Sequence, residues 1–171
     1  MSQFVATLVE VLRSLWLGLR SNLPEGGALR DDVWRSRHRG LLLLLWLHIP
    51  IILGWAMRAK GSLVHGVAEA IVVVAVAMLA SWSRLSRRTR AALVSLGLLS
   101  CSALLVHLSG GVIEVHFHFF VMVAIISLYQ DWTPFLLAIS YVIVHHGLLG
   151  VLVPTKVYNH PAAWANPWKW P

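Results

Sequence analysis

Residues 112–130 read VIEVHFHFFVMVAIISLYQ. Apolar side chains dominate this run, and Glu114 is its one charged residue. A helix needs roughly 20 apolar residues to cross the hydrocarbon core of a bilayer, whereas a strand of a membrane barrel alternates over about ten. The run therefore predicts a helix that spans a membrane.

Four further apolar runs of similar length lie at residues 41–57, 63–82, 91–108 and 134–153. Because the polar links between consecutive runs are short, neighbouring helices must be antiparallel. We therefore expect an all-α fold. Its centre would be a polytopic membrane helix bundle with five transmembrane helices over residues 41–153.

The composition of the chain points to the same class of protein. Hydrophobic residues make up 58% of the 171 residues and charged residues 12%, whereas a soluble domain has about 45–50% apolar and about 25% charged residues. This excludes an ordinary soluble enzyme, a disordered tail and a secreted disulfide scaffold. No catalytic motif is recognisable and no basic groove interleaved with aromatics, so neither an enzyme nor a nucleic-acid partner is expected.

Two polar segments flank the bundle. Residues 1–40 form a cytoplasmic segment, in which the leucine spacing over 3–20 predicts an amphipathic helix lying on a membrane face or on a partner. Residues 154–171 form a tail rich in proline and tryptophan, which excludes a regular helix and suits the headgroup zone of the outer face. The lipid bilayer is thus the first expected partner.

The basic residues predict the orientation of the bundle. Ten of the 14 Lys+Arg fall in residues 1–40 and 83–90, and four fall on the opposite side. Since the cytoplasmic side carries the excess of Lys and Arg, we expect a cytoplasmic N-terminus and an outer C-terminus, in the inner (cytoplasmic) membrane of a bacterium.

With this orientation, eight of the nine histidines lie between mid-membrane and the outer surface. Ionisable groups in a bilayer are costly, so such a layer indicates a functional site. The candidate ligands for a cofactor are the deeper imidazoles, His48, His116, His118, His145 and His146. A metal site could draw on His65, Glu69, His107, Glu114, His116 and His118.

The spacing of these residues predicts particular pairs. His65 with Glu69, and Glu114 with His118, stand four residues apart and share a helix face. Each carboxylate could fix an imidazole tautomer, or the two groups could simply neutralise each other. His145 and His146 diverge by about 100° on an α-helix, so they are not expected to face one site centre together.

Seven short motifs follow one another along the chain: WLHIP at 46–50, CSALLVHLSGG at 101–111, EVHFHFF at 114–120, LYQDW at 128–132, HH at 145–146, VYNHP at 157–161 and NPW at 166–168. In this order they resemble the histidine-rich multi-pass sensory region of bacterial chemotaxis receptors, histidine kinases and GGDEF proteins. The resemblance covers roughly residues 34–170. It implies a sensory role with signalling proteins as partners, although the 171 residues contain no output module of that family.

Three functions remain open from the sequence. The first is a sensory-type domain that binds haem b, or a copper or zinc ion, through histidines of the outer half. The second is a cofactor-free accessory subunit of a larger membrane complex, whose histidines only form hydrogen bonds between helices. The third is a proton pathway through Glu69, Glu114 and the histidines, which the apolar inner halves of the runs disfavour.

Overall fold

The computed structural model describes residues 25–60 and 63–169, without the side chains of residues 59, 60, 63 and 65, together with scattered positions between 5 and 21. Helices make up most of this described part, and it contains no strand. The all-α expectation is therefore confirmed for it. The positions described between 5 and 21 are helical and exposed, and the rest of the amphipathic helix expected over 3–20 lies outside the described residues.

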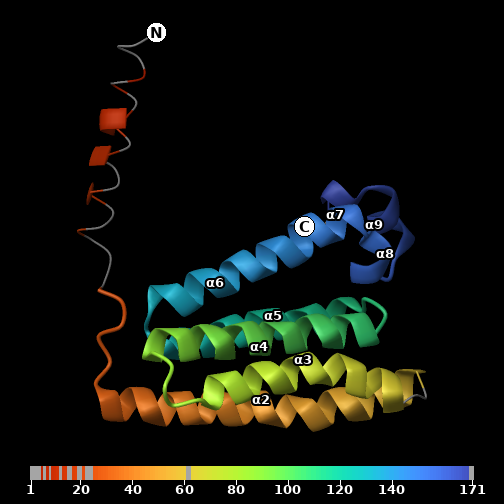
Figure 1. Ribbon diagram of the computed structural model, residues 1–171. Helices are drawn as coiled ribbons and strands as arrows, with labels where there is room; N and C mark the ends of the chain where they lie inside the picture. Colours follow the sequence, from red (N-terminus) through yellow and green to blue (C-terminus); the bar gives the residue numbers. More distant parts are fainter. Residues whose placement is uncertain are drawn as a thin grey trace.

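Four long helical segments run back and forth beside one another (Figure 1). They are α2 (Asp31–Lys60), α3 (Leu63–Ser81), α4 (Arg87–Leu108), and α5 (Ile113–Ile126) with its 3₁₀ extension η1 (Ser127–Tyr129). Each matches one apolar run, and the alternating directions follow from the short links. Two left-handed glycines, Gly110 (φ 73°) and Gly111 (φ 82°), make the tight turn between α4 and α5.

The last apolar run forms a continuous but irregular helical stretch. It consists of α6 (Trp132–Ile143), the π-helix η2 (Val144–Leu149) and α7 (Gly150–Leu152). The tail then folds into three short pieces, α8 (Pro154–Val157), α9 (Pro161–Ala165) and η3 (Pro167–Lys169). Proline is tolerated in the first turn of a helix but interrupts its interior, which explains why the tail forms only short pieces.

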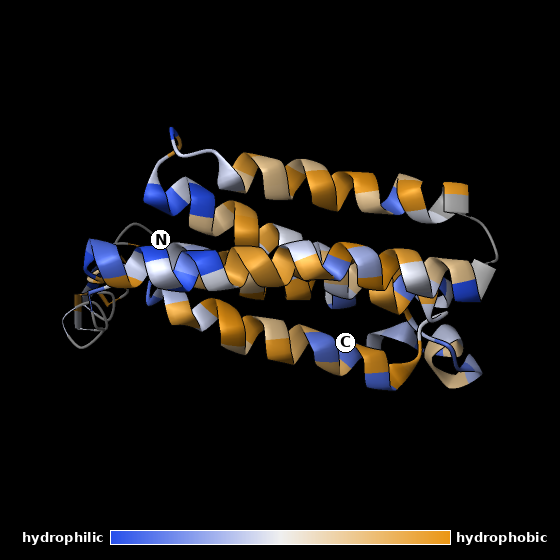
Figure 2. Cartoon of the chain, turned by 90° about the horizontal axis from the view of Figure 1, so that it is seen from below, coloured by the Kyte–Doolittle hydropathy of each residue, from blue (hydrophilic) through white to orange (hydrophobic). Residues whose placement is uncertain are grey.

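Three of these helices are long and apolar enough to cross a membrane, over Asp31–Arg58, Arg87–Leu108 and Trp132–Leu152. Two further apolar helices, Gly66–Ser81 and Ile113–Tyr129, are shorter. Figure 2 shows apolar residues along the middle of the helices, and hydrophilic residues gathered where α2 and α4 begin. Three helices are thus candidate membrane spans by their length and composition, and five crossings remain a prediction.

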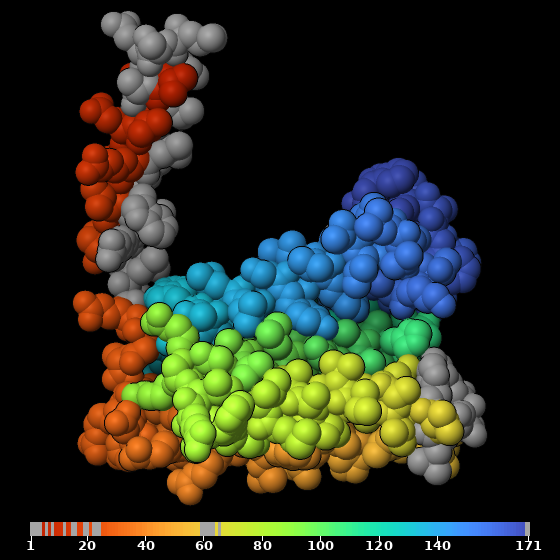
Figure 3. Space-filling model, viewed as in Figure 1, coloured from red at the N-terminus to blue at the C-terminus, as the bar shows by residue number. Residues whose placement is uncertain are grey.

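Helix α4 lies at the centre of the bundle. In its apolar window 61% of the residues are buried, against 28% for the window in α2 and 17% for that in the stretch from α6 to α7. It packs against α2, α3, α5 and α6, and in Figure 3 it lies between α3 in yellow and α6 in blue. Small residues permit this close approach: a Cβ at Gly97 would lie 2.8 Å from a methyl group of Leu45 and 3.2 Å from one of Val76.

The arginine-rich stretch before the first apolar run is part of α2, which begins ten residues earlier than that run, at Asp31. One face of this extension is buried. The Trp34 and His38 rings stack with centroids 4.6 Å apart, and His38 Nδ1 lies 2.8 Å from the Tyr129 hydroxyl. The guanidinium groups of Arg87 and Arg90 lie 5.0 and 5.3 Å from the Trp34 ring centroid. Composition suggested a polar segment here, but tertiary packing makes it a helix.

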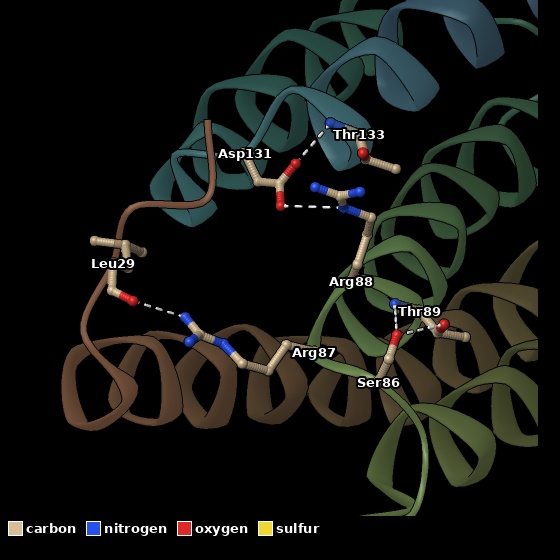
Figure 4. Close-up of polar contacts among 7 residues, drawn as sticks. All are labelled: Leu29, Ser86, Arg87, Arg88, Thr89, Asp131 and Thr133. Atoms are coloured by element: carbon tan, nitrogen blue, oxygen red, sulfur yellow. Dashed lines mark hydrogen bonds and ion pairs between the residues drawn. The ribbon is translucent and has the colours of Figure 1, made fainter. Parts of the chain in front are cut away.

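Polar contacts tie the ends of α2, α4 and α6 together on this side (Figure 4). Arg88 of α4 forms an ion pair with Asp131 at 3.7 Å. The Asp131 carboxylate also accepts a hydrogen bond from the N–H of Thr133, in the first turn of α6. Arg87 donates to the Leu29 carbonyl oxygen at 2.9 Å and pairs with Asp31. These contacts anchor the arginine-rich end of the bundle.

Candidate functional site: two groups of histidines

The five deeper histidines do not form a single cluster. His48 of α2 and His118 of α5 face each other with ring centroids 5.2 Å apart. His116 of α5 instead meets His146 of η2, also with centroids 5.2 Å apart, and His145 lies 5.0 Å from His146. His116 and His118 therefore point to different sites, as expected for residues two apart on one helix.

In the first group, hydrogen bonds set the proton positions. His48 Nδ1 lies 2.7 Å from the Leu44 carbonyl oxygen, which can only accept, so Nδ1 carries the proton and Nε2 presents a lone pair. His118 Nε2 lies 3.2 Å from His48 Nε2 and donates to it. His118 Nδ1 then accepts from the Ser102 hydroxyl at 2.8 Å. The two imidazoles and the serine form one chain of hydrogen bonds.

This geometry also suits a metal ion. Two imidazole nitrogens bound to a tetrahedral ion at about 2.0–2.1 Å lie roughly 3.3 Å apart, close to the observed 3.2 Å. With an ion in place, His118 would carry its proton on Nδ1 and donate to Ser102, which in turn lies 3.2 Å from the Leu98 carbonyl oxygen. Metal-ligating histidines usually donate their second N–H in this way.

A haem does not fit this pair. Two axial imidazoles stand on opposite faces of the iron, with nitrogens about 4 Å apart at bond lengths of roughly 2 Å and the porphyrin between them. The direct 3.2 Å contact between His48 and His118 leaves no room for a porphyrin. Of the two cofactors expected from the sequence, the pair fits only the bare metal ion.

The second group presents nitrogens without hydrogen-bond partners. His116 Nδ1 lies 3.0 Å from the Val112 carbonyl oxygen, and His146 Nδ1 lies 3.2 Å from that of Val142. Each Nε2 is then a lone pair, and His116 Nε2 is buried and unpartnered, as is His145 Nδ1. Buried polar atoms without partners are costly, so this group is suited to receive a cation or a proton donor.

His145 and His146 lie in the π-helix η2. Both rings contact Phe119, with centroid distances of 4.8 and 5.1 Å. The prediction that the two imidazoles diverge assumed α-helical spacing, whereas both residues lie in a π-helix, in which i→i+5 hydrogen bonding widens the turn. It stays a prediction. π turns are frequent at functional sites in proteins.

Tyr158 covers the second group from the tail. Its ring stacks on His116 with centroids 5.9 Å apart and planes 13° apart, and its carbonyl oxygen accepts from Trp164 Nε1 at 2.7 Å. Two glycines make room for it. A Cβ at Gly111 would lie 2.8 Å from the Tyr158 carbonyl carbon, and one at Gly150 would lie 2.7 Å from the hydroxyl. Burial raises the pKa of the Tyr158 phenol, which therefore stays protonated.

Of the two carboxylate–histidine pairs expected within single helices, the one between Glu114 and His118 is not formed. Both ring nitrogens of His118 are engaged by His48 and Ser102, so the pairing with Glu114 is not made, and Glu114 is exposed. Glu69 Oε1 instead lies 3.5 Å from Nε2 of His107, on the neighbouring helix α4. The side chain of His65 lies outside the described residues, so its pairing with Glu69 stays a prediction.

Among the described side chains, no group of three or more His, Cys, Asp and Glu converges on one point as metal ligands do. A metal ion on His48 and His118 would therefore have two protein nitrogens and further positions open to small molecules. The residues proposed from sequence as metal ligands lie in more than one place. His107 and its neighbour Glu69 lie along a different face of α4 from Ser102 and its partner His118.

Sequence reasoning missed Ser102 and Tyr158. A signal for Ser102 existed: it lies eight residues before Gly110, and His118 lies eight residues after it, so an antiparallel turn at Gly110 puts them side by side. No local pattern links Tyr158 to His116, because that contact depends on how the tail folds back on the bundle.

Alanine variants at the two glycines of the α4–α5 turn can separate the effect of packing against Tyr158 from that of backbone strain. Gly110→Ala and Gly111→Ala should each lose about 1–2 kcal/mol of stability, since both positions are left-handed. Only the Gly111→Ala side chain meets the backbone of Tyr158, so it should also uncover His116. Modification by diethyl pyrocarbonate, mapped by mass spectrometry, should rise at His116 in Gly111→Ala alone. Equal modification in both variants would contradict the role of Tyr158 as a cover.

Comparison with known proteins shows a relation to a transducer. Over 159 residues the chain is 42% identical to Transducer protein Htr8 of Halobacterium salinarum, an alignment that covers 86% of this chain and 25% of that protein. No protein-family model matches, and no solved structure matches. The chain thus spans about a quarter of the length of the transducer that it matches, and it is related in sequence to that part of a halobacterial transducer.

Proposed function

We propose that this chain is a sensory domain of the cytoplasmic membrane, in which His48 and His118 bind a copper or zinc ion in the outer half of a five-helix bundle. The sensory role is supported by the relation to a transducer. The site is supported by the 3.2 Å separation of the two Nε2 atoms, each on a ring whose Nδ1 is held by a hydrogen bond.

Packing favours five crossings. Helices α3 and α5 are shorter than the other three, but each lies antiparallel between or beside longer apolar helices. Arg87 and Arg90, in the first turn of α4, lie over Trp34 near the start of α2. The arginines that begin these two helices thus share one end of the bundle, which favours that end as the cytoplasmic one. The histidine groups then lie toward the outer face, and signalling partners would meet the arginine-rich end.

The ion suits a sensor because its two ligands come from different helices. When bound, copper or zinc would supply a Lewis-acidic centre with open positions for a small molecule, and copper in addition a redox couple. His48 precedes Pro50, which interrupts the hydrogen bonding of α2. A change in the separation of His48 and His118 would thus be transmitted along α2 and α5, whose inner ends meet again at His38 and Tyr129.

The first test measures metal content. Protein purified without chelator should contain copper or zinc by elemental analysis, and His48→Ala and His118→Ala should each lose it. His160→Ala, in the tail, should retain it. A Soret band in place of the metal, or the absence of both a metal and a haem, would overturn the proposed site.

The second test uses two buried serines on the same helix. Ser95 and Ser102 are both fully buried in α4, and the hydroxyl of each lies within hydrogen-bond distance of the carbonyl oxygen four residues earlier, but only Ser102 contacts His118. Ser102→Ala should weaken metal binding about 10–100-fold, as loss of a partner that orients a ligand does, while Ser95→Ala should not. If the two variants bind the metal with equal affinity in a competition titration, Ser102 does not contribute to the site.

The third test concerns sensing itself. Spin labels on Arg39→Cys of α2 and Leu128→Cys of η1, two exposed positions at the inner end, should change their distance distribution when metal is added. The buried Cys101 is not expected to react. The change should vanish in His118→Ala. A distribution that metal leaves unaltered, in protein that binds it, would contradict the sensory role while leaving the metal site intact.

A further inference from the structure

A groove of about 420 Å³ lies on the face of α4 opposite to the first histidine group. Its floor is α4, and its walls are α3 on one side and the α6–η2–α8 stretch on the other. The lining is mostly apolar, with Val72, Ala103, Leu104, Leu149, Val153 and Val157. Pockets that bind small molecules have this size and character, about 300–1,000 Å³ and mainly apolar with a few polar groups.

The groove runs along the helices. Figure 3 shows α4 between α3 and the α6–η2 stretch on one face of the molecule. Ser100 and His107 of α4 mark its two ends, about 10 Å apart at 1.5 Å per residue. Because Val72, Leu149 and Val153 of its lining are exposed, the groove is open to the side of the bundle, where the bilayer would surround the helices. A molecule dissolved in the membrane could enter it without passing through water.

The two ends differ in polarity. At the inner end the Tyr141 hydroxyl donates to Ser100 at 3.4 Å, so the two polar groups of that end are hydrogen-bonded to each other. At the outer end lie Glu69, His107 and Lys156. Glu69 faces His107, and its side chain is 12% exposed, whereas Lys156 is exposed and makes no ion pair within the described part of the chain. Lys156, at the outer rim, is therefore the cation with which a ligand could pair.

We propose that this groove binds a single-chain anionic amphiphile of the long-chain carboxylate class, with its head at Lys156 and His107. The chain lies along Leu104, Leu149 and Val153 and reaches toward Tyr141. A carboxylate beside Lys156 gains a charge-assisted hydrogen bond, and the apolar lining removes the chain from neighbouring lipid. His48 and His118 take no part in this site, so its test can fail without affecting the proposed metal site, and the reverse also holds.

The size of the groove selects one chain over two. At the roughly 30 Å³ that a water molecule occupies in the liquid, a volume of about 420 Å³ holds about fourteen non-hydrogen atoms. That is a carboxylate with much of one alkyl chain, whereas an anionic phospholipid brings a larger head and two chains. Free carboxylate and phospholipid share an anionic head, and the experiment below distinguishes them.

The test uses the protein in nanodiscs of phosphatidylcholine, with a diazirine derivative of palmitic acid as the photoactivated probe. Adducts mapped by mass spectrometry should fall on α4, η2 and α8 residues that line the groove. Excess palmitic acid should displace the probe, while phosphatidylglycerol and methyl palmitate should not. Labelling spread evenly over the lipid-facing helices, or equal displacement by methyl palmitate, would overturn the proposal, and displacement by phosphatidylglycerol would reject the single-chain assignment.

Variants locate the head. Lys156→Ala should weaken probe binding about tenfold, the effect of losing one hydrogen bond to a charged group, and Lys156→Arg should restore most of it. Lys169→Ala is the matched control, since Lys169 is an exposed lysine of the same tail that does not line the groove. Ala103→Trp should block the groove from its floor. Unchanged binding in Lys156→Ala would remove the anionic head from the proposal.

Discussion

Close packing around α4 is the constraint on which the rest of the structure depends. The four long helices α2, α3, α5 and α6 all pack against this one helix, so its side chains must be small on several faces at once. Gly97 meets Leu45 and Val76 without a side chain of its own, and Ser95 and Ser102 are fully buried. Small residues are what let helices approach closely in a bilayer, where no hydrophobic effect drives them together.

The same helix supplies the polar partners of the bundle. Ser102 contacts His118, Ser100 contacts Tyr141, and His107 contacts Glu69. In a lipid environment a polar side chain has no water to bond with, so its partner must come from the protein. A central helix that carries serines and a histidine therefore does two things at once: it permits close packing, and it holds the imidazoles and the carboxylate in defined orientations.

The sequence predicted the extent of the helices better than the partners of their histidines. Hydropathy located each apolar run, and the helices follow these runs closely, except that α2 extends back to Asp31 because Trp34 and His38 pack against Tyr129. Pairing within one helix was the weaker guide. Glu114 and His118 share a face, but His118 meets the neighbouring helices first, because rotation about the helix axis is set by packing and not by local spacing.

What the sequence by itself determined is the class of the protein, an all-helical membrane chain with its histidines concentrated toward one end of the helices. Hydropathy and link length are local properties, so they can be read without knowing the fold. Only the tertiary structure decided that five histidines form two groups, that Ser102 completes one and Tyr158 covers the other. These contacts depend on the rotation of each helix, on a π turn at His145 and His146, and on the path of the tail. None of these is encoded in the spacing of a single helix, because each results from packing between segments far apart in the chain.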